Sequence, residues 1–172
     1  MLYVFVEGPD DERYFNKIYG ACFQKRYESY KIIKYAHWKK DKIDNFIKSI
    51  ARIPGVDYIF FGDADGKNTE DKKRELTEIY KKLSPEKIFI VRYEIESWYY
   101  AGIDENQCRE LKLKRYEYMT DDVTKEDFYN KLPKRPDRVM IMTKILDDYS
   151  IKLACLRNQS LRVFHEAMCP AV

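Results

Sequence analysis

The sequence predicts an α/β protein with a mostly parallel central sheet of about four strands, flanked by helices and followed by a helical C-terminal appendage. Short apolar runs of strand length alternate with patterns of helical spacing, as is typical of parallel strands joined by right-handed crossovers. A composition of 45% hydrophobic and 35% charged residues describes a folded, highly charged chain. The expected strands are residues 2–6, 30–35, 58–62 and 88–91.

The first strand is the continuous apolar run Leu2–Val6, of the kind that is covered on both faces of a sheet. Gly8 and Pro9 make a turn after it, and the acids of this turn favour a helix start, where the helix dipole is positive. Apolar and aromatic side chains then continue at helical spacing as far as Tyr19. The chain therefore opens with a strand, an acidic turn and a helix.

Two amphipathic helices are predicted between the later strands, because apolar side chains recur at positions i, i+3, i+4 and i+7. The first of these patterns covers residues 43–50 and is closed by a Pro-Gly pair. The second covers residues 76–83, follows a cap at Asn68 or Thr69, and ends before Pro85.

The pattern changes after about residue 104. Residues 1–104 form the predicted α/β core. Residues 105–172 form a basic, mainly helical extension, with helical patterns at 139–146 and 161–168. We expect this extension to pack on the core, so that the chain is a single domain overall.

The third strand runs directly into two acids, Asp63 and Asp65. They follow the carboxyl end of a parallel strand, where open α/β sheets place their ligands. At positions i and i+2 of an extended segment, both carboxylates would point the same way and repel unless a cation lay between them. Hard divalent cations prefer oxygen ligands, so a Mg²⁺ site is the first hypothesis. The alternative is an Asp-Gly turn whose acids bond only to the backbone.

Acids follow two other predicted strands as well. Glu7 and Asp11 come after the first strand, and Glu94 and Glu96 come after the fourth. Because parallel strands all end at one edge of the sheet, these acids can converge. Like charges a few Å apart disfavour joint ionisation, so such an edge would be costly without cations. The predicted metal ligands are Glu7, Asp11, Asp63, Asp65, Glu94 and Glu96.

Two motifs, Val6-Glu7-Gly8-Pro9-Asp10-Asp11 and Phe61-Gly62-Asp63-Ala64-Asp65, resemble in their order the Toprim domain shared by topoisomerases, bacterial-type primases and OLD-family nucleases. The segment Glu94–Ala101 is similar to the Glu-x-Trp segment of small stand-alone OLD-like Toprim proteins. Lys144 and the segment Ser160–Phe164 are similar to the pattern near their C-termini. The resemblance implies a Toprim-like (Rossmann-like) fold and Mg²⁺-dependent or Mn²⁺-dependent chemistry on nucleic-acid phosphodiester bonds.

By position, the resemblance also implies roles for the acids. Glu7 matches the Toprim glutamate, and Asp63 and Asp65 match the Asp-x-Asp pair of the family. Asp11 matches an acid found one helical turn beyond that glutamate in OLD-like members. The acid of the third motif is matched by Glu96, with Glu94 as the second choice.

A two-metal hydrolysis agrees with this set of acids. Two cations about 4 Å apart could clamp a phosphodiester, one activating water and the other stabilising the leaving oxygen. Glu7 could serve as a ligand or as the general base. Lys67, or Lys144, which matches a basic residue of OLD-like nucleases, could neutralise charge on the phosphate. We therefore expect a metal-dependent nuclease with catalytic roles for Glu7, Lys67 and Lys144.

Clusters of basic residues predict contacts with DNA or RNA. The net charge of +3 is small, but it grows if cations neutralise the proposed metal-site acids, which supports salt-dependent phosphate binding. Trp38, Tyr116 and Tyr118 lie beside basic residues and could stack on bases, whereas solvated lysine faces are the alternative. Further clusters include Lys42 and the run Lys72-Lys73-Arg74. The proposed contacts are Lys39, Lys40, Lys112, Lys114, Arg115, Lys131, Lys134, Arg135 and Arg138.

Two other functions stay open. Some Toprim domains bind nucleic acid or partner proteins without cutting, which is the non-enzyme alternative. A HAD-type phosphatase also carries a strand followed by Asp-x-Asp-Gly, with the first Asp as nucleophile. That motif should lie on the first strand, however, and should have Thr or Val where Lys67 stands. Full-length OLD proteins also carry an ATPase, so activity could require such a partner.

No apolar run approaches membrane-spanning length, and the N-terminus has no signal-peptide pattern. The four cysteines are scattered without a CxxC pair, which argues against a zinc site. We therefore expect a cytoplasmic protein with no membrane partner.

Overall fold

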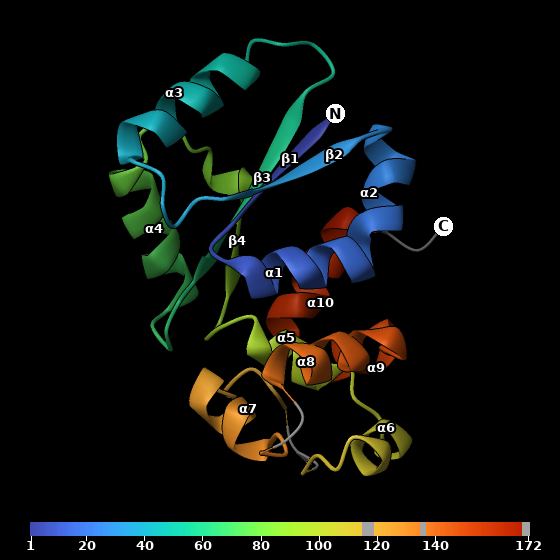
Figure 1. Ribbon diagram of the computed structural model, residues 1–172. Helices are drawn as coiled ribbons and strands as arrows, with labels where there is room; N and C mark the ends of the chain where they lie inside the picture. Colours follow the sequence, from blue (N-terminus) through green and yellow to red (C-terminus); the bar gives the residue numbers. More distant parts are fainter. Residues whose placement is uncertain (115–118, 135–136, 170–172) are drawn as a thin grey trace. The chain divides into compact units, whose positions relative to one another are not determined.

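The computed structural model describes residues 1–114, 119–134 and 137–169. The chain divides into two compact units, Met1–Val91 and Arg92–Val172. The first unit contains the sheet, and the regular structure described in the second unit is helical (Figure 1). No helix within the described residues combines the length and the apolar character that a membrane span needs.

A four-stranded sheet forms the centre of the first unit, with the strand order β2-β1-β3-β4. All three strand pairs are parallel. The predicted α/β class with about four strands and C-terminal helices is therefore confirmed, and the sheet is consistent with a Toprim-like or Rossmann-like fold. The strands are β1 (Leu2–Val6), β2 (Tyr30–Lys34), β3 (Asp57–Asp63) and β4 (Ile88–Val91).

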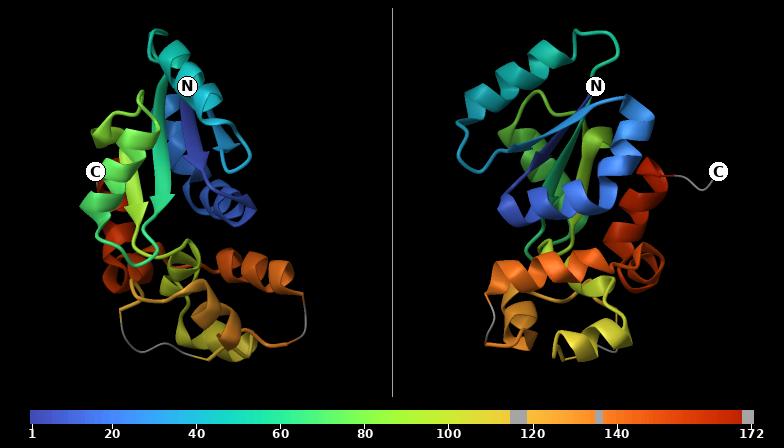
Figure 2. Two further views of the ribbon diagram at one scale, coloured as in Figure 1. Left: turned by 90° about the vertical axis from the view of Figure 1, so that its left-hand side faces the viewer. Right: turned by 45° about the vertical axis from the view of Figure 1, so that its right-hand side comes forward.

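Helices connect these strands and lie on both sides of the sheet (Figures 1 and 2). The predicted first helix is interrupted by a π-helical turn, and the two amphipathic patterns correspond to α3 and α4. The elements are α1 (Pro9–Tyr14), the π-helical turn η1 (Phe15–Tyr19), α2 (Gly20–Tyr27), α3 (Lys40–Ile50), α4 (Thr69–Ile79) and the 3₁₀ turn η2 (Pro85–Lys87).

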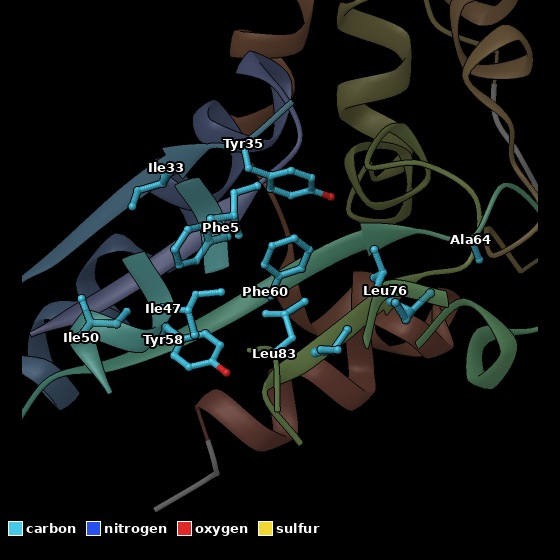
Figure 3. Close-up of a cluster of buried hydrophobic side chains, with 13 residues drawn as sticks. Phe5, Ile33, Tyr35, Ile47, Ile50, Tyr58, Phe60, Ala64, Leu76 and Leu83 are labelled. Carbon is cyan, nitrogen blue, oxygen red and sulfur yellow. The ribbon is translucent and has the colours of Figure 1, made fainter. Parts of the chain in front are cut away.

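Consecutive aromatic residues of β3 face opposite sides of the sheet, as the alternation along a strand requires. Phe60 stacks on Phe5 of β1, with ring centroids 5.7 Å apart, in the core cluster that also holds Ile47 of α3 (Figure 3). Phe61 packs on the other side against Phe15 of η1, with centroids 4.3 Å apart. Both faces of the sheet are therefore buried, as its continuous apolar strands predict.

Helix α4 differs from its prediction at the C-terminal end. Asn68 caps it by accepting the backbone N–H of Glu70 at 2.9 Å, as expected. The helix ends at Ile79, however, because Tyr80 adopts an extended backbone with φ −107° and ψ 94°. Leu83 is nevertheless buried in the same core, so the apolar spacing continues past the end of the helix.

The second unit begins directly after β4, so the residues of α5 group with it and not with the sheet. The predicted patterns at 139–146 and 161–168 correspond to α8 and α10. Its helices in the described residues are α5 (Glu96–Ala101), α6 (Glu105–Glu110), α7 (Lys125–Lys131), α8 (Arg138–Asp147), α9 (Ile151–Arg157) and α10 (Gln159–Met168).

Trp98 of α5 packs against α10 within the second unit. The side chain is 0% exposed, and its Nε1–H donates to the Oγ of Ser160 at 2.9 Å. The indole ring also stacks on Phe164, with centroids 5.8 Å apart and an interplanar angle of 20°. The Glu-x-Trp segment and the Ser-x-x-x-Phe segment of the sequence thus form one buried cluster.

Candidate metal centre

Glu7 and Asp63 lie at the carboxyl edge of neighbouring strands. Glu7 directly follows β1 and Asp63 is the last residue of β3. The register pairs Phe5 with Phe60, which puts Glu7 level with the residue before Asp63. If this register continues, strand spacing and rise put the Cα atoms of Glu7 and Asp63 about 6 Å apart. Strand alternation, however, places Glu7 on the face of Phe60 and Asp63 on the face of Phe61, so a shared ion at the strand ends requires one side chain to turn around the edge of the sheet.

Tyr35 is the strongest evidence that the acids converge. This buried residue follows β2, and its hydroxyl donates to the carbonyl oxygen of Phe61 at 2.9 Å. Since β1 lies between β2 and β3, the tyrosine reaches across the end of β1. Burial raises the pKa of Tyr35 most, and the carboxylates of Glu7, Asp63 and Asp11 raise it further. Acids from two separate β–α junctions therefore lie near enough to one buried hydroxyl to raise its pKa.

Asp11 has a structural role as well. Its Oδ2 accepts the backbone N–H of Gly8 at 3.0 Å, which closes a capping box at the start of α1. The residue is buried, with 6% of its surface exposed. The bond to Gly8 fixes the carboxylate one helical turn beyond Glu7, where the sequence places the third acid of the site.

Asp65 does not continue the strand. β3 ends at Asp63, and Asp65 has φ 51° while Gly66 has φ 76°. The backbone N–H of Lys67 donates to the carbonyl of Ala64 at 2.9 Å and closes this turn. The expectation that strand alternation points both carboxylates the same way is therefore wrong, because the chain turns between them. Asp65 is exposed in an Asp-Gly turn.

Gly62 sets how closely α4 approaches the site. A Cβ atom at this position would lie 2.6 Å from Cδ1 of Leu76, closer than real Cβ atoms come to a neighbour. A larger residue at this position would therefore force the end of the Leu76 side chain to shift. Glycine allows this close packing of α4 on β3 at the residue that precedes Asp63.

Lys67, in the turn that precedes α4, pairs with a residue of that helix. Its side chain is 62% exposed, and its Nζ lies 3.6 Å from Oε2 of Glu75. Lys72 also pairs with Glu75, at 3.2 Å. The pKa of Glu75 is lowered, mainly by the hydrogen bond from Lys72 and also by Lys67. A role of Lys67 at a phosphate would require it to leave Glu75.

Glu94 and Glu96, which lie before and at the start of α5, both contact Lys125 in the first turn of α7, within the second unit. Glu96 is 1% exposed, accepts the hydroxyl of Tyr129 at 2.6 Å and lies 3.5 Å from Nζ of Lys125. Glu94 accepts the backbone N–H of Lys125 at 2.9 Å. Burial raises the pKa of Glu94, the bond from Lys125 opposes this, and Glu96 adds to it. Both acids therefore have a structural task within this unit, which the sequence analysis did not anticipate.

The remaining predicted residues are mostly at the surface. Lys144 of α8 is exposed. Lys131 is half-buried, and the guanidinium of Arg138 lies 4.7 Å from the ring centroid of Tyr129. Arg115, Tyr116, Tyr118 and Arg135 lie outside the described residues. The other predicted nucleic-acid contacts, all exposed, are Lys39, Lys40, Lys112, Lys114 and Lys134.

The donor chemistry of the first unit fits a hard divalent cation, because Glu7, Asp11 and Asp63 offer carboxylate oxygens. In the conformations that the described residues adopt, no three acidic, histidine or cysteine side chains are arranged to hold a metal ion. Binding would therefore require the acids around Tyr35 to turn toward a common point.

Comparison of the chain with protein-family models, curated proteins and solved structures found no match. What the fold and the site define is an α/β protein with acids at the carboxyl ends of neighbouring parallel strands. Sequence reasoning missed Tyr35 as part of this site. The signal that could have found it is its place directly after a strand, at the edge where the acids lie.

Replacing Tyr35 by Phe should change how stability depends on pH. Below about pH 10 the hydroxyl is protonated in both states. Above that pH the unfolded chain loses the proton while the buried hydroxyl keeps it, so the wild type loses up to about 1.4 kcal/mol per pH unit from this group. Tyr35→Phe should be about 1 kcal/mol less stable at neutral pH. Urea unfolding should show this gap closing at alkaline pH, and a constant gap would contradict the raised pKa of the buried hydroxyl.

Proposed function

We propose that this protein is a Mg²⁺-dependent or Mn²⁺-dependent nuclease of the Toprim type, which hydrolyses phosphodiester bonds of DNA or RNA. The observation that carries the proposal is that Glu7 and Asp63 follow neighbouring parallel strands and, with Asp11, lie near enough to the buried hydroxyl of Tyr35 to raise its pKa. Mutual repulsion makes such a group of carboxylates unfavourable, and divalent cations would convert the repulsion into coordination. The proposal includes a cytoplasmic location, and activity could depend on a partner protein or ATPase.

The residues of the first unit divide the work as follows. Divalent cations, when bound, supply an activated water and stabilise the leaving oxygen. Asp63 and Glu7 would hold them, together with Asp11, whose orientation is fixed by the N–H of Gly8. Glu7 is exposed at the end of β1, so it can also accept the proton of the attacking water. Lys67 would leave Glu75 and pair with the phosphate.

We assign the metal to the acids of the first unit. Metal binding by Glu94 or Glu96 would have to displace Lys125, which contacts both of them at 3.9 Å and 3.5 Å through its Nζ. Breaking a contact of the nearly buried Glu96 is costly unless the cation replaces it. The resemblance assigns these two acids to the metal, and their contacts with Lys125 favour a structural role.

The same contacts favour a second candidate function, a Toprim module that binds nucleic acid without cutting it. Without Glu94 and Glu96, the remaining metal-binding acids would still hold a cation, but the site would lack groups needed for phosphodiester hydrolysis. Cleavage assays separate the two candidates, because only the nuclease converts plasmid DNA or RNA to shorter products in the presence of Mn²⁺.

Thermal unfolding with and without Mn²⁺ tests the proposed centre. A ligand at 100 times its Kd stabilises a protein by about 2.7 kcal/mol, so Mn²⁺ should raise the melting temperature of the wild type by several degrees. Glu7→Gln should abolish this increase. Glu12→Gln is the matched control, because Glu12 is a nearby acid that pairs with Lys34, and it should respond to Mn²⁺ like the wild type. An equal response in all three proteins, or none in the wild type, would overturn the proposal.

A further inference from the structure

A basic segment with one tryptophan lies at the β2–α3 junction. The Trp38 patch consists of Trp38, Lys39, Lys40 and Lys42. The backbone N–H of Trp38 donates to the carbonyl of Tyr35 at 2.8 Å, so the two residues are joined by one turn. The patch therefore starts one turn after Tyr35, whose pKa is raised by burial and by Glu7 and Asp63 of the candidate metal centre.

The lysines of the Trp38 patch differ from those of α4. Lys39, Lys40 and Lys42 are exposed, and among the described residues no ion pair involves their side chains. The run Lys72-Lys73-Arg74 on α4 is, in contrast, paired with acids of its own helix. Asp41 is the one acid inside the patch segment. The patch therefore keeps a net positive charge, whereas the α4 run is largely neutralised.

Trp38 offers a ring face to a ligand. The half-buried indole packs against Phe46 in a T-shaped contact, with centroids 5.8 Å apart and an interplanar angle of 75°. The Nζ of Lys42 lies 3.8 Å from the ring centroid, over the face. Cation–π contact and base stacking use the same face of an aromatic ring. A base could take the place of the ammonium group, and Lys42 would then be released to pair with a phosphate.

We propose that the Trp38 patch binds single-stranded nucleic acid, with one base stacked on Trp38 and the lysines on the flanking phosphates. The direction of the bound strand, toward Glu7 and Asp63, rests on the proposed function. A single strand is the class of ligand that fits, because bases within a duplex are stacked on one another and do not offer their faces. Stacking tolerates every base, so both DNA and RNA single strands are ligands of this surface.

Fluorescence anisotropy with labelled oligo-dT, oligo-U and a duplex of equal length tests the patch. The titrations contain EDTA, so that binding is measured without metal or cleavage. Trp38→Leu should weaken binding of the single strands about 10- to 100-fold and leave weak duplex binding unchanged. The double variant Lys39→Ala/Lys40→Ala should lower the salt slope of single-strand binding by about 1.4. Lys72→Ala/Lys73→Ala is the control and should bind like the wild type.

The outcomes test the Trp38 patch and the proposed nuclease activity independently of one another. Single-strand binding that both patch variants retain, or a duplex bound more tightly than the single strands, would overturn the patch. Cleavage at wild-type KM by Trp38→Leu would also overturn it and leave the nuclease standing. If no protein cuts but the patch variants lose single-strand binding, the patch stands and the nuclease fails. The double variant Lys39→Ala/Lys40→Ala removes only exposed side chains, so its single-strand binding tests the patch even if Trp38→Leu unfolds.

Discussion

Replacing Asp63 by Asn is expected to reduce Mn²⁺-dependent cleavage about 10³-fold or more. A bound cation contributes several kcal/mol of transition-state stabilisation, and each 1.36 kcal/mol is about tenfold in rate. Asn keeps the size of the side chain and removes the charge that would hold the cation. Asp63 is the half-buried last residue of β3. Cleavage of plasmid and RNA substrates at saturating Mn²⁺ measures the effect.

Asp57→Asn is the matched control for Asp63→Asn. Asp57 is the first residue of the same strand, so the same chemical change is made at the opposite edge of the sheet. Its carboxylate lies 2.9 Å from the Nζ of Lys87, in a partly exposed pair whose loss costs about 1 kcal/mol or less. This variant should cut like the wild type. Equal loss of cleavage in both variants would mean that stability, and not the metal centre, explains the result.

Replacing Trp98 by Ala is expected to destabilise the second unit by about 3–5 kcal/mol. The indole is 0% exposed, stacks on Phe164 and donates to the Oγ of Ser160, so its removal leaves a cavity and removes the hydrogen bond that this hydroxyl accepts. Urea unfolding followed by far-UV circular dichroism measures the loss. Val163→Ala on α10, next to Phe164, is the control, because Val163 is 55% exposed and should change stability by about 0.5 kcal/mol or less. A Trp98→Ala variant as stable as this control would contradict the proposed cluster.

The strands could be predicted because each is a short apolar run between turn residues. The prediction for β1 agrees with Leu2–Val6, and the predicted run 58–62 lies inside β3. The start of α4 could be predicted as well, since Asn68 caps the helix as its side chain suggests. The end of α4 could not be predicted, because Leu83 packs in the core from outside the helix and its position continues the apolar spacing of the helix.

The candidate site could be predicted only in part. The convergence of Glu7 with Asp63 follows from parallel topology, which the alternation of strands and helices indicates. The orientation of Asp65 depends on where β3 ends, and no residue pattern marks that point before the Asp-Gly turn. The partners of Glu96 depend on Lys125 and Tyr129, which belong to a capped helix in a polar region. Contacts between segments so far apart leave no local signal in a single sequence.

A crystal soaked in Mn²⁺ and measured at the manganese absorption edge tests the central claim most directly. The account predicts an anomalous peak bonded to carboxylate oxygens of both Glu7 and Asp63, at the end of β1 and β3. A peak bound only elsewhere, or Glu7 and Asp63 held more than about 10 Å from one another, would show that these acids share no ion.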